Sequence, residues 1–426
     1  MFIKRLATYW LVLTMALLSG CASISKGITQ AYLEQETEDT RQCWITGRSF
    51  DGLDSLIQAD NESASGTSDS DKLKVLMVHG IGNHAPGYSR RLQDGLVEEF
   101  GFESMDETIK TIALSHPSYP DSLGVLRVHR YMDLQSSQEM LFFELTWDSI
   151  VDKEKQILSF DYSTEASVKR APFNHTLKTF INNTVPDALM YNTKYRSPIQ
   201  LSVAQAICWG LSEKWENLPN NQESHCSVKD SNYMSQYDQG NFAIISHSLG
   251  SRISLDALQE SMQQISKLPD YENISDQFKT QPMYLYMLSN QLPLLQLGQK
   301  LPQVHGQTRS ICTAEGDKYD ERFFEKLQIV AFSDPNDLFS YAVSPDYASR
   351  YIDSRLCPAV SNVTIQIAEV RNFLLGTSEV ANPLVAHSGY EIDSRVLKML
   401  VSGFGKDHGQ EEVESRCEFI ESIPYY

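Results

Sequence analysis

The sequence predicts a chain of the α/β class, in which short strands alternate with helices. Apolar runs of strand length recur along it, and we expect strands at 74–78, 125–128, 140–147, 241–245, 283–288, 327–332 and 362–368. Between these runs are stretches with apolar residues at helical spacing, above all 199–215 and 249–265. Alternation of the two element types is typical of a sheet whose strands are connected by helices.

The N-terminus is expected to be a signal peptide. Lys4 and Arg5 give a positively charged start, and the apolar stretch 6–18 that follows is too short to span a membrane. The stretch ends in Leu-Ser-Gly-Cys at 18–21, which resembles the processing site of a bacterial lipoprotein. The resemblance implies that Cys21 receives lipid and becomes the new N-terminus. An ordinary secretory signal with an incidental cysteine is the alternative.

Residues beyond this cysteine bear on location. Ala22 stands where an Asp would resemble the signal that retains Gram-negative lipoproteins in the inner membrane. We therefore expect attachment to the outer membrane, facing the periplasm. The full chain carries 36 Lys and Arg against 55 Asp and Glu, a net charge of −19. Because such a surface repels phosphate backbones, nucleic-acid binding is not expected, and membrane attachment is assigned to the lipid.

The cysteines predict disulfides. Six remain after Cys21, at positions 43, 208, 226, 312, 357 and 417. An even number in an exported protein indicates pairing, and we expect at least two disulfides. Cys208–Cys226 is the favoured local pair because few residues separate its members. The sequence has no Cys-x-x-Cys or His-x-x-x-His spacing, so neither a metal site nor a cofactor is predicted.

Composition divides the chain into three parts. Residues 1–20 are the signal, and 21–71 are a polar N-terminal segment that ends in a linker rich in Ser, Asp and Gly. The folded domain is expected to span 72–426. Two insertions, at about 148–238 and 290–324, are expected to cap the carboxyl edge of the sheet. Part of the first should be the helix before the next strand, and Cys208–Cys226 would staple the remainder.

One strand ends in a pattern that can make a serine reactive. The apolar run 241–245 leads into Ser-His-Ser-Leu-Gly, and a helix is expected to follow. Small residues two positions before and after Ser248 allow a sharp strand-to-helix turn, which exposes the hydroxyl and points the helix N-terminus at the reacting oxygen. Ser246 replaces the first glycine of the usual Gly-x-Ser-x-Gly pattern, which makes the match less specific.

Partners for a reactive serine follow other predicted strands. The glycine-rich segment 79–84 comes directly after the first of them, and its backbone N–H groups could face a carbonyl oxygen. Asp334 and Asp337 follow a later strand, and His387 follows the last one. A nucleophile, an acid and a base therefore occur in the order Ser, Asp, His, each on a loop at the end of a strand.

In these motifs and their order, the chain resembles the α/β-hydrolase family of serine esterases and lipases over residues 72–400. The resemblance implies the α/β-hydrolase fold, a mostly parallel central sheet with helices on both faces and site loops at the strand carboxyl ends. It also implies hydrolysis of an acyl ester through an acyl-enzyme, as in a carboxylesterase or lipase. Amides and thioesters are cleaved by the same apparatus and stay open as substrates.

The resemblance also assigns roles to individual residues. Ser248 would be the nucleophile, His387 the base, and Asp337 the acid that orients the base. The backbone N–H groups of Ile81 and Leu249 would form the oxyanion hole. Protein partners are not predicted.

Several of these roles have competitors. Asp334 shares the acid loop, but it precedes a proline and could cap the turn, whereas apolar residues follow Asp337 as in the family. His247 is adjacent to the serine, but neighbouring side chains on a tight turn diverge, so it is expected to be a packing residue and not the base. His408 also lies beyond the acids, but in a polar run. His79 is expected to fix the shape of its loop.

Two other functions fit parts of the sequence. Segment 80–85 matches the dinucleotide-binding pattern Gly-x-Gly-x-x-Gly/Ala, but Pro86 and Gly87 follow it where a helix should begin. The second is a catalytically inactive hydrolase fold that acts as an interaction module of the cell envelope. The presence of Ser248, His387 and both aspartates argues against it, because a binding module needs none of them.

Overall fold

The computed structural model describes residues 39–58, 72–136, 138–162, 170–230, 241–373, 378–405 and 411–421. The compact unit that contains the sheet is Gln42–Tyr426. The predicted signal peptide, Cys21, the linker 59–71 and His408 lie outside the described residues. Among the helices that are described, none is both long and apolar enough to cross a membrane.

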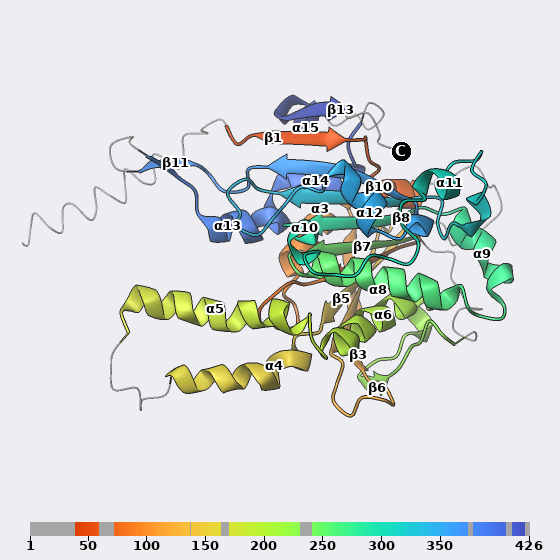
Figure 1. Cartoon of the computed structure of the whole chain (residues 1–426), viewed down its shortest axis with the longest axis horizontal. Coiled ribbons are helices and arrows are strands. Elements are labelled where there is room, and N and C mark those ends of the chain that lie inside the picture. The colour runs from red at the N-terminus through yellow and green to blue at the C-terminus, as the bar shows by residue number, and fades with distance from the viewer. Residues whose placement is uncertain are drawn as a thin grey trace, which may run out of the picture. The chain divides into compact units, whose positions relative to one another are not determined.

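Eleven of the described strands form one sheet, in the order β13-β1-β10-β9-β8-β7-β2-β5-β4-β3-β6 (Figure 1). The central strands are β10 (Pro358–Ile365), β9 (Leu327–Ser333), β8 (Met283–Leu288), β7 (Asn241–His247), β2 (Lys72–Val78) and β5 (Glu139–Thr146). Each of these pairs in parallel with its neighbour in the series. The predicted α/β class with a mostly parallel sheet is confirmed.

The other strands lie at the edges of this sheet or in a separate pair. They are β4 (Val125–Met132), β3 (Glu103–Leu114), β6 (Gln222–Ser224), β1 (Cys43–Gly47), β13 (Cys417–Glu421), β11 (Arg371–Phe373) and β12 (Ser378–Val380). At one edge β4 is antiparallel to both β5 and β3, and at the other β1 is antiparallel to β10. β11 and β12 form a two-stranded antiparallel sheet.

Helices cover both faces of the large sheet. The described α-helices are α2 (Asp54–Gln58), α3 (Arg90–Phe100), α4 (Ser149–Lys155), α5 (Pro172–Met190), α6 (Arg196–Ser212), α8 (Gly250–Ile265), α9 (Tyr271–Lys279), α10 (Leu292–Leu295), α11 (Thr308–Cys312), α12 (Pro345–Tyr351), α13 (Pro383–Ser388), α14 (Ser394–Ser402) and α15 (Glu411–Arg416). Short 3-10 helices are η2 (Gln156–Tyr162), η3 (Trp215–Asn217), η4 (Tyr319–Glu321), η5 (Ser354–Leu356) and η6 (Gly389–Ile392).

The period-two alternation of a strand produces two apolar cores. In β2, Leu76 and Val78 belong to the core that contains buried residues of α6 and α8. Val75 and Met77 belong to the opposite core, with buried residues of α3 and α14. The predicted helices 199–215 and 249–265 correspond to α6 and α8. The parallel strands are therefore packed between α6 and α8 on one face of the sheet and α3 and α14 on the other.

The predicted start of the domain at residue 72 is wrong. β1 lies between β10 and β13 in the sheet, and the segment that follows it buries Phe50, Leu53 and Ile57 in the core. Alternating burial over only five residues is too short a pattern to stand out within a polar segment. The last part of the expected N-terminal segment, from residue 42 to residue 58, thus belongs to the folded unit.

Two strands also differ from the prediction. The strand expected at 362–368 begins and ends earlier, as β10, because Asn362 continues an extended segment that starts at Pro358. β3 was not predicted at all. Its twelve residues mix polar and apolar types, which suits a strand near the edge of a sheet, where less of the surface is covered.

Disulfides pair the six cysteines that follow Cys21, as Cys43–Cys417, Cys208–Cys226 and Cys312–Cys357. The expectation of at least two, with Cys208–Cys226 among them, is confirmed. Its expected place in a cap is wrong, because Cys208 lies on α6 and both of its sulfurs are buried in the core shared with α8. α6 is the helix expected before β7, so among the described residues of 148–238 it is the α4–α5 part that projects from the sheet (Figure 1).

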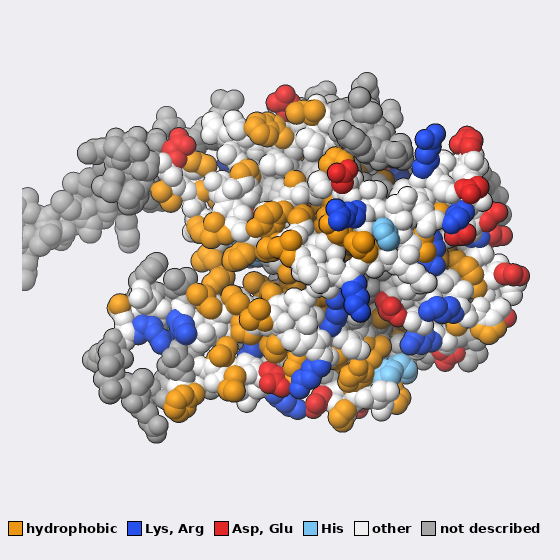
Figure 2. Space-filling model, viewed as in Figure 1, with side chains coloured by type: hydrophobic (Ala, Val, Ile, Leu, Met, Phe, Trp, Pro, Cys, Tyr) orange, Lys and Arg blue, Asp and Glu red, His pale blue; other side chains and the backbone are white. Residues whose placement is uncertain are grey.

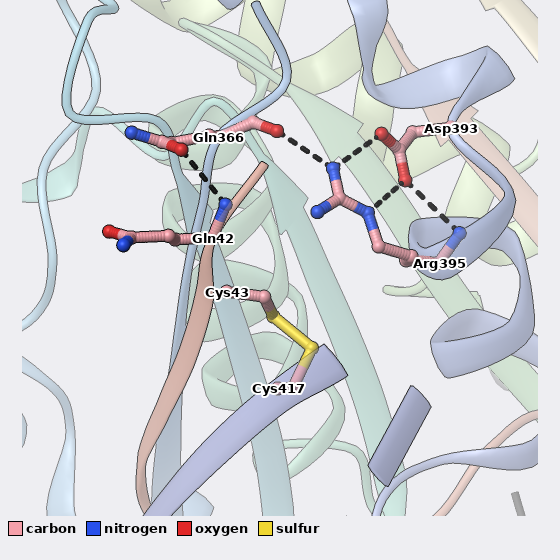
Figure 3. Close-up of a disulfide and its surroundings, with 6 residues drawn as sticks. All are labelled: Gln42, Cys43, Gln366, Asp393, Arg395 and Cys417. Carbon is pink, nitrogen blue, oxygen red and sulfur yellow. Dashed lines mark hydrogen bonds and ion pairs between the residues drawn. A yellow bond between two sulfur atoms is a disulfide. The ribbon is translucent and has the colours of Figure 1, made fainter. Parts of the chain in front are cut away.

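The Cys43–Cys417 disulfide joins two neighbouring strands at the edge of the sheet (Figure 3). The chain just after β10 is held nearby. The N–H of Gln42 donates to Gln366 Oε1 at 2.8 Å, and Arg395 Nη2 donates to the backbone oxygen of Gln366 at 2.7 Å. These contacts fix the start of the segment that leads from β10 to α13.

Candidate active site

Ser248 lies on a sharp turn between β7 and α8. Its φ is +56°, in the left-handed region, and its N–H donates to the backbone oxygen of Leu288 at 2.9 Å. A Cβ atom on Gly250 would lie 2.4 Å from the backbone oxygen of Val78. One on Gly80 would lie 2.6 Å from the Ser248 Cβ. The predicted strand–turn–helix forms because both glycines allow this close approach.

Ser246 takes the place of the usual first glycine of this turn. Its side chain is fully buried, and its hydroxyl donates to the backbone oxygen of Tyr286 on β8 at 3.2 Å. The turn tolerates a serine here because the neighbouring strand supplies an acceptor for the buried hydroxyl.

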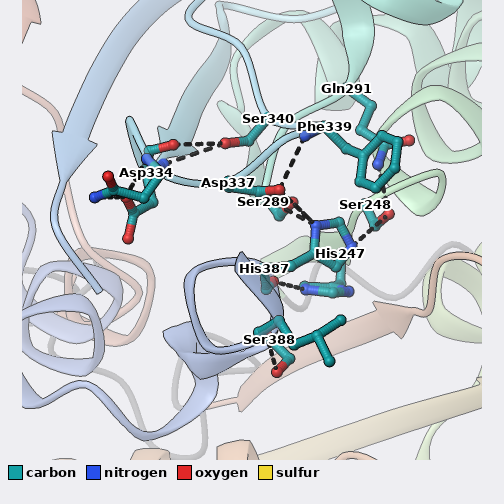
Figure 4. A network of polar contacts seen from close by, with 12 residues as sticks. His247, Ser248, Ser289, Gln291, Asp334, Asp337, Phe339, Ser340, His387 and Ser388 are labelled. Atoms are coloured by element: carbon teal, nitrogen blue, oxygen red, sulfur yellow. Dashed lines mark hydrogen bonds and ion pairs between the residues drawn. The ribbon is translucent and has the colours of Figure 1, made fainter. Parts of the chain in front are cut away.

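The structure brings the three predicted triad residues together (Figure 4). Ser248 Oγ lies 3.1 Å from His387 Nε2, and His387 Nδ1 lies 3.0 Å from both carboxylate oxygens of Asp337. In the tautomer that fits these contacts, Nδ1–H donates to Asp337 and Nε2 accepts the Ser248 hydroxyl. The arrangement therefore allows a proton to pass from the serine to the imidazole.

His387 lies in the last turn of α13, so the expectation that it lies on a loop is wrong. Pro383 starts this six-residue helix, and the Asn382 side chain caps it by accepting from the N–H groups of Leu384 at 3.0 Å and Val385 at 3.4 Å. Such a short helix has too few residues for an apolar period to appear in the sequence. The cap fixes where α13 begins, and this determines the position of His387 and the direction of its ring.

His247 supports α13 rather than acting as the base. Its Nε2–H donates to the backbone oxygen of His387 at 2.8 Å. Burial, and then the nearby imidazole of His387, lower the pKa of His247 to about 3, so that it stays neutral. The structure thus gives this histidine the packing position expected from the sequence.

Asp337 is buried, yet its carboxylate is well supplied with donors. Burial alone would raise its pKa, but the hydrogen bond and charge of His387 oppose this. The hydroxyl of Ser289 donates to it at 2.7 Å, and the N–H of Phe339 donates at 3.0 Å. The net effect holds the pKa of Asp337 below its ordinary value, which keeps an anion beside the imidazole.

Asp334 has a different set of contacts. Its Oδ2 accepts from the N–H of Ile367 at 2.7 Å and from that of Ala368 at 3.0 Å, and its Oδ1 accepts from the N–H of Asn336 at 2.7 Å. These bonds tie the turn after β9 to the segment after β10. Of the two aspartates that the sequence left open, it is Asp337 that contacts His387.

Two further site residues, Ser289 and Gln291, were not predicted. Ser289 Oγ lies 3.0 Å from His387 Nδ1 as well as contacting the acid, and Gln291 Nε2 donates to Ser248 Oγ at 2.8 Å. A signal was present, because the polar run 289–291 directly follows the buried strand β8, whose carboxyl end lies beside that of β7. Polar residues that follow a central strand at this edge are candidates for the site, as the aspartates after β9 are.

The glycine-rich loop 79–84 approaches the serine from β2. Neither the N–H of Ile81 nor that of Leu249 has a hydrogen-bond acceptor within the described parts of the chain. Two other N–H groups of the loop are occupied: Gly82 donates to Asp187 Oδ2 at 2.7 Å, and His84 donates to Asp148 Oδ2 at 3.1 Å. The two predicted oxyanion donors are thus left available, while carboxylates hold the loop at Gly82 and His84.

His79 shapes the start of this loop, as expected. Its Nε2 accepts the N–H of Trp147 at 3.2 Å, its Nδ1–H donates to the backbone oxygen of Gly80 at 2.9 Å, and its ring stacks on the indole with centroids 4.9 Å apart. Burial is the main reason that its pKa lies well below the ordinary value. His79 is therefore neutral and fixed by two hydrogen bonds.

Exposed apolar side chains lie on elements that carry or contact site residues, and we call this set the apolar rim. Three lie close in sequence to the acid and the base: Leu338, Leu384 and Val385. Three more recur every four residues on α5, which places them on one face of that helix: Ile181, Val185 and Leu189. Figure 2 shows hydrophobic side chains gathered between α13 and α5.

The described residues contain no group of His, Cys, Asp or Glu arranged to hold a metal ion. In segment 80–85, the acceptors of backbone N–H groups are carboxylates, which would repel a dinucleotide phosphate. Comparisons with protein-family models, with curated protein sequences and with solved structures found no match.

Proposed function

We propose that the protein is a serine hydrolase of the α/β-hydrolase type that cleaves a carboxylic ester through an acyl-enzyme. The proposal rests on one observation, the continuous line of hydrogen bonds from Ser248 Oγ through His387 to Asp337. Its nucleophile has a left-handed φ on a turn between a strand and a helix. Strained, buried polar residues of this kind are concentrated at functional sites.

In this mechanism His387 accepts the proton of Ser248 as Oγ attacks the acyl carbon. Asp337 holds the imidazole in the required tautomer and stabilises the imidazolium. The N–H groups of Ile81 and Leu249 bind the oxyanion, and His387 then protonates the leaving alcohol. Water, deprotonated by the same histidine, cleaves the acyl-enzyme and releases the acid.

The apolar rim supports an ester with an apolar acyl or alcohol group as the substrate. Burial of each CH₂ group against such side chains contributes about 0.8 kcal/mol, so binding should strengthen as the chain lengthens. Attachment to the outer membrane through lipid on Cys21, facing the periplasm, is part of the proposal. Mass spectrometry of the mature N-terminus tests it: acylated Cys21 supports the anchor, and an unmodified N-terminus at another residue overturns it.

The experiment that tests the proposed activity is hydrolysis of 4-nitrophenyl esters of graded acyl length. The wild type should hydrolyse them, and Ser248→Ala should lower turnover by at least ~10³, because only the oxyanion hole and binding remain. Ser261→Ala, a buried serine on the same helix α8, is the matched control and should keep wild-type turnover. Equal turnover in Ser248→Ala and the wild type would refute the proposal.

A further inference from the structure

Gln291 is held against the nucleophile by its side chain and its backbone. Its side chain is buried, and Nε2 donates to Ser248 Oγ at 2.8 Å. Its backbone N–H donates to Ser251 Oγ at 3.2 Å, and that hydroxyl donates to the backbone oxygen of Ser248 at 2.7 Å. Gln291 is therefore in direct contact with the atom that would react.

The segment that carries Gln291 is fixed on both sides. Ser289 has a left-handed φ of +51°, and Asn290 donates through its backbone to Phe332 at 2.9 Å and through its side chain to Tyr341 at 2.7 Å. The Asn290 side chain also accepts the N–H of Leu292, which starts α10. Because a left-handed φ is costly for a serine, this geometry is maintained by its contacts, and it directs Gln291 at the turn that carries Ser248.

The two contacts of Ser248 Oγ have complementary chemistry. Its O–H donates to His387 Nε2, while one lone pair accepts from the Gln291 amide. As the proton moves to the imidazole, negative charge develops on Oγ. A hydrogen bond to a charged oxygen is roughly twice as strong as one to a neutral oxygen, so the amide stabilises the transition state more than the resting state.

We propose that Gln291 is a catalytic residue that stabilises the charge on Ser248 Oγ. It acts when the Oγ–C bond forms and the serine proton passes to His387, and again when that bond breaks in deacylation and the proton returns. This inference rests on the proposed hydrolase function. It assigns the side-chain amide a role beside the backbone donors of the oxyanion hole.

Two variants of Gln291 test the role. Gln291→Met keeps the length and removes the donor, and it should lower kcat by about 10², the order of loss when one donor of an oxyanion hole is removed. Gln291→Glu keeps the shape but places an anion beside Oγ. Its kcat relative to wild type should be lowest at neutral and alkaline pH and should rise as the pH falls, because only a protonated carboxyl can donate.

Gln263→Met, which removes a half-buried glutamine of α8 that donates to Asp353, is the control and should keep wild-type kcat. Wild-type kcat in Gln291→Met would overturn the inference. So would a constant ratio of Gln291→Glu to wild type across pH, which also decides the case if Gln291→Met folds poorly. An inactive wild type would instead overturn the proposed function itself, so the two failures are distinguishable.

Discussion

The two sides of the proposed active site are held in place by different parts of the molecule. The triad side consists of Ser248, His387 and Asp337, and its supports are groups at the ends of the central strands, such as the Ser289 hydroxyl. The oxyanion side is the loop 79–84, and its supports are carboxylates that belong to the α4–α5 region. The triad side thus depends on the sheet, and the oxyanion side depends on the helices that project from it.

The electrostatics of the two sides differ in the same way. Donors outweigh burial at Asp337 and hold its pKa below the ordinary value. At Asp187 and Asp148 burial dominates and raises the pKa of each carboxyl, although the Lys155 ammonium lies 3.1 Å from Asp187. The surroundings of Asp337 therefore stabilise its charged form. The surroundings of Asp187 and Asp148, behind the oxyanion loop, destabilise theirs, because burial removes water from the carboxylates.

The largest effect should come from the triad side. Asp337→Asn should reduce kcat by about 10⁴, because an amide favours the wrong tautomer of His387. Asp334→Asn is the matched control on the same loop and should mainly lower the melting temperature, because its contacts are backbone N–H groups. Turnover assays and thermal unfolding of both variants check this, and the reverse ranking would transfer the role of acid to Asp334.

A smaller effect should come from the oxyanion side. Asp187→Ala leaves the Gly82 N–H without its acceptor, so the oxyanion loop should shift. A displacement of about 1 Å can lower kcat/KM by up to about 10². Asp152→Ala is the control, since Asp152 pairs with the same lysine, Lys155, at 3.2 Å. It should keep most of the activity. Full activity in folded Asp187→Ala would show that the loop does not depend on α5.

The Cys208–Cys226 disulfide lies away from both sides, in the core between α6 and α8. Replacing both cysteines with serine should lower the free energy of unfolding by roughly 3 kcal/mol. KM and kcat should stay near wild type at temperatures where the variant is folded. Chemical denaturation measures the free energy of unfolding, and ester kinetics measure KM and kcat. A changed substrate preference in the folded variant would contradict this and support a role of the disulfide in a cap.

The smallest effect should be a pH-dependent stability where η6 packs against α3 and α13. Burial raises the pKa of Glu391, on η6 just after α13, to about 7. A carboxyl with a raised folded pKa loses stability as the pH rises from its unfolded value through the folded one. Glu391→Gln should therefore gain about 1–3 kcal/mol relative to wild type at pH 8 and little at pH 4. An equal gain at both values would contradict this.

The residues on the triad side could be predicted because each lies in a local pattern. Ser248 follows an apolar strand and precedes Gly250, and the acid and histidine follow later strands in a recognisable order. The apolar residues after Asp337 favoured it as the acid, but the choice between Asp334 and Asp337 was not settled in this way. It depends on which carboxylate meets the N–H groups of the segment after β10, and that is a tertiary contact.

The supports could not be predicted, because they join distant parts of the chain. Asp187 and Gly82 are separated by 105 positions, and nothing near either residue indicates the other. β1 is short and lies next to the edge strand β13, so its pattern is weak, and its place in the sheet depends on pairing with β10. Local patterns thus indicated most central strands and the residues proposed to react, while the contacts that hold those residues in place come from long-range packing.

Fluorophosphonate labelling followed by peptide mapping tests the central claim most directly. A fluorophosphonate reacts with a serine only when a base and an oxyanion hole activate it, so both sides of the site are needed. The account predicts one labelled peptide containing Ser248, with labelling abolished in Ser248→Ala and preserved in Ser261→Ala. No labelling of the folded wild type, or labelling that persists in Ser248→Ala, would contradict it.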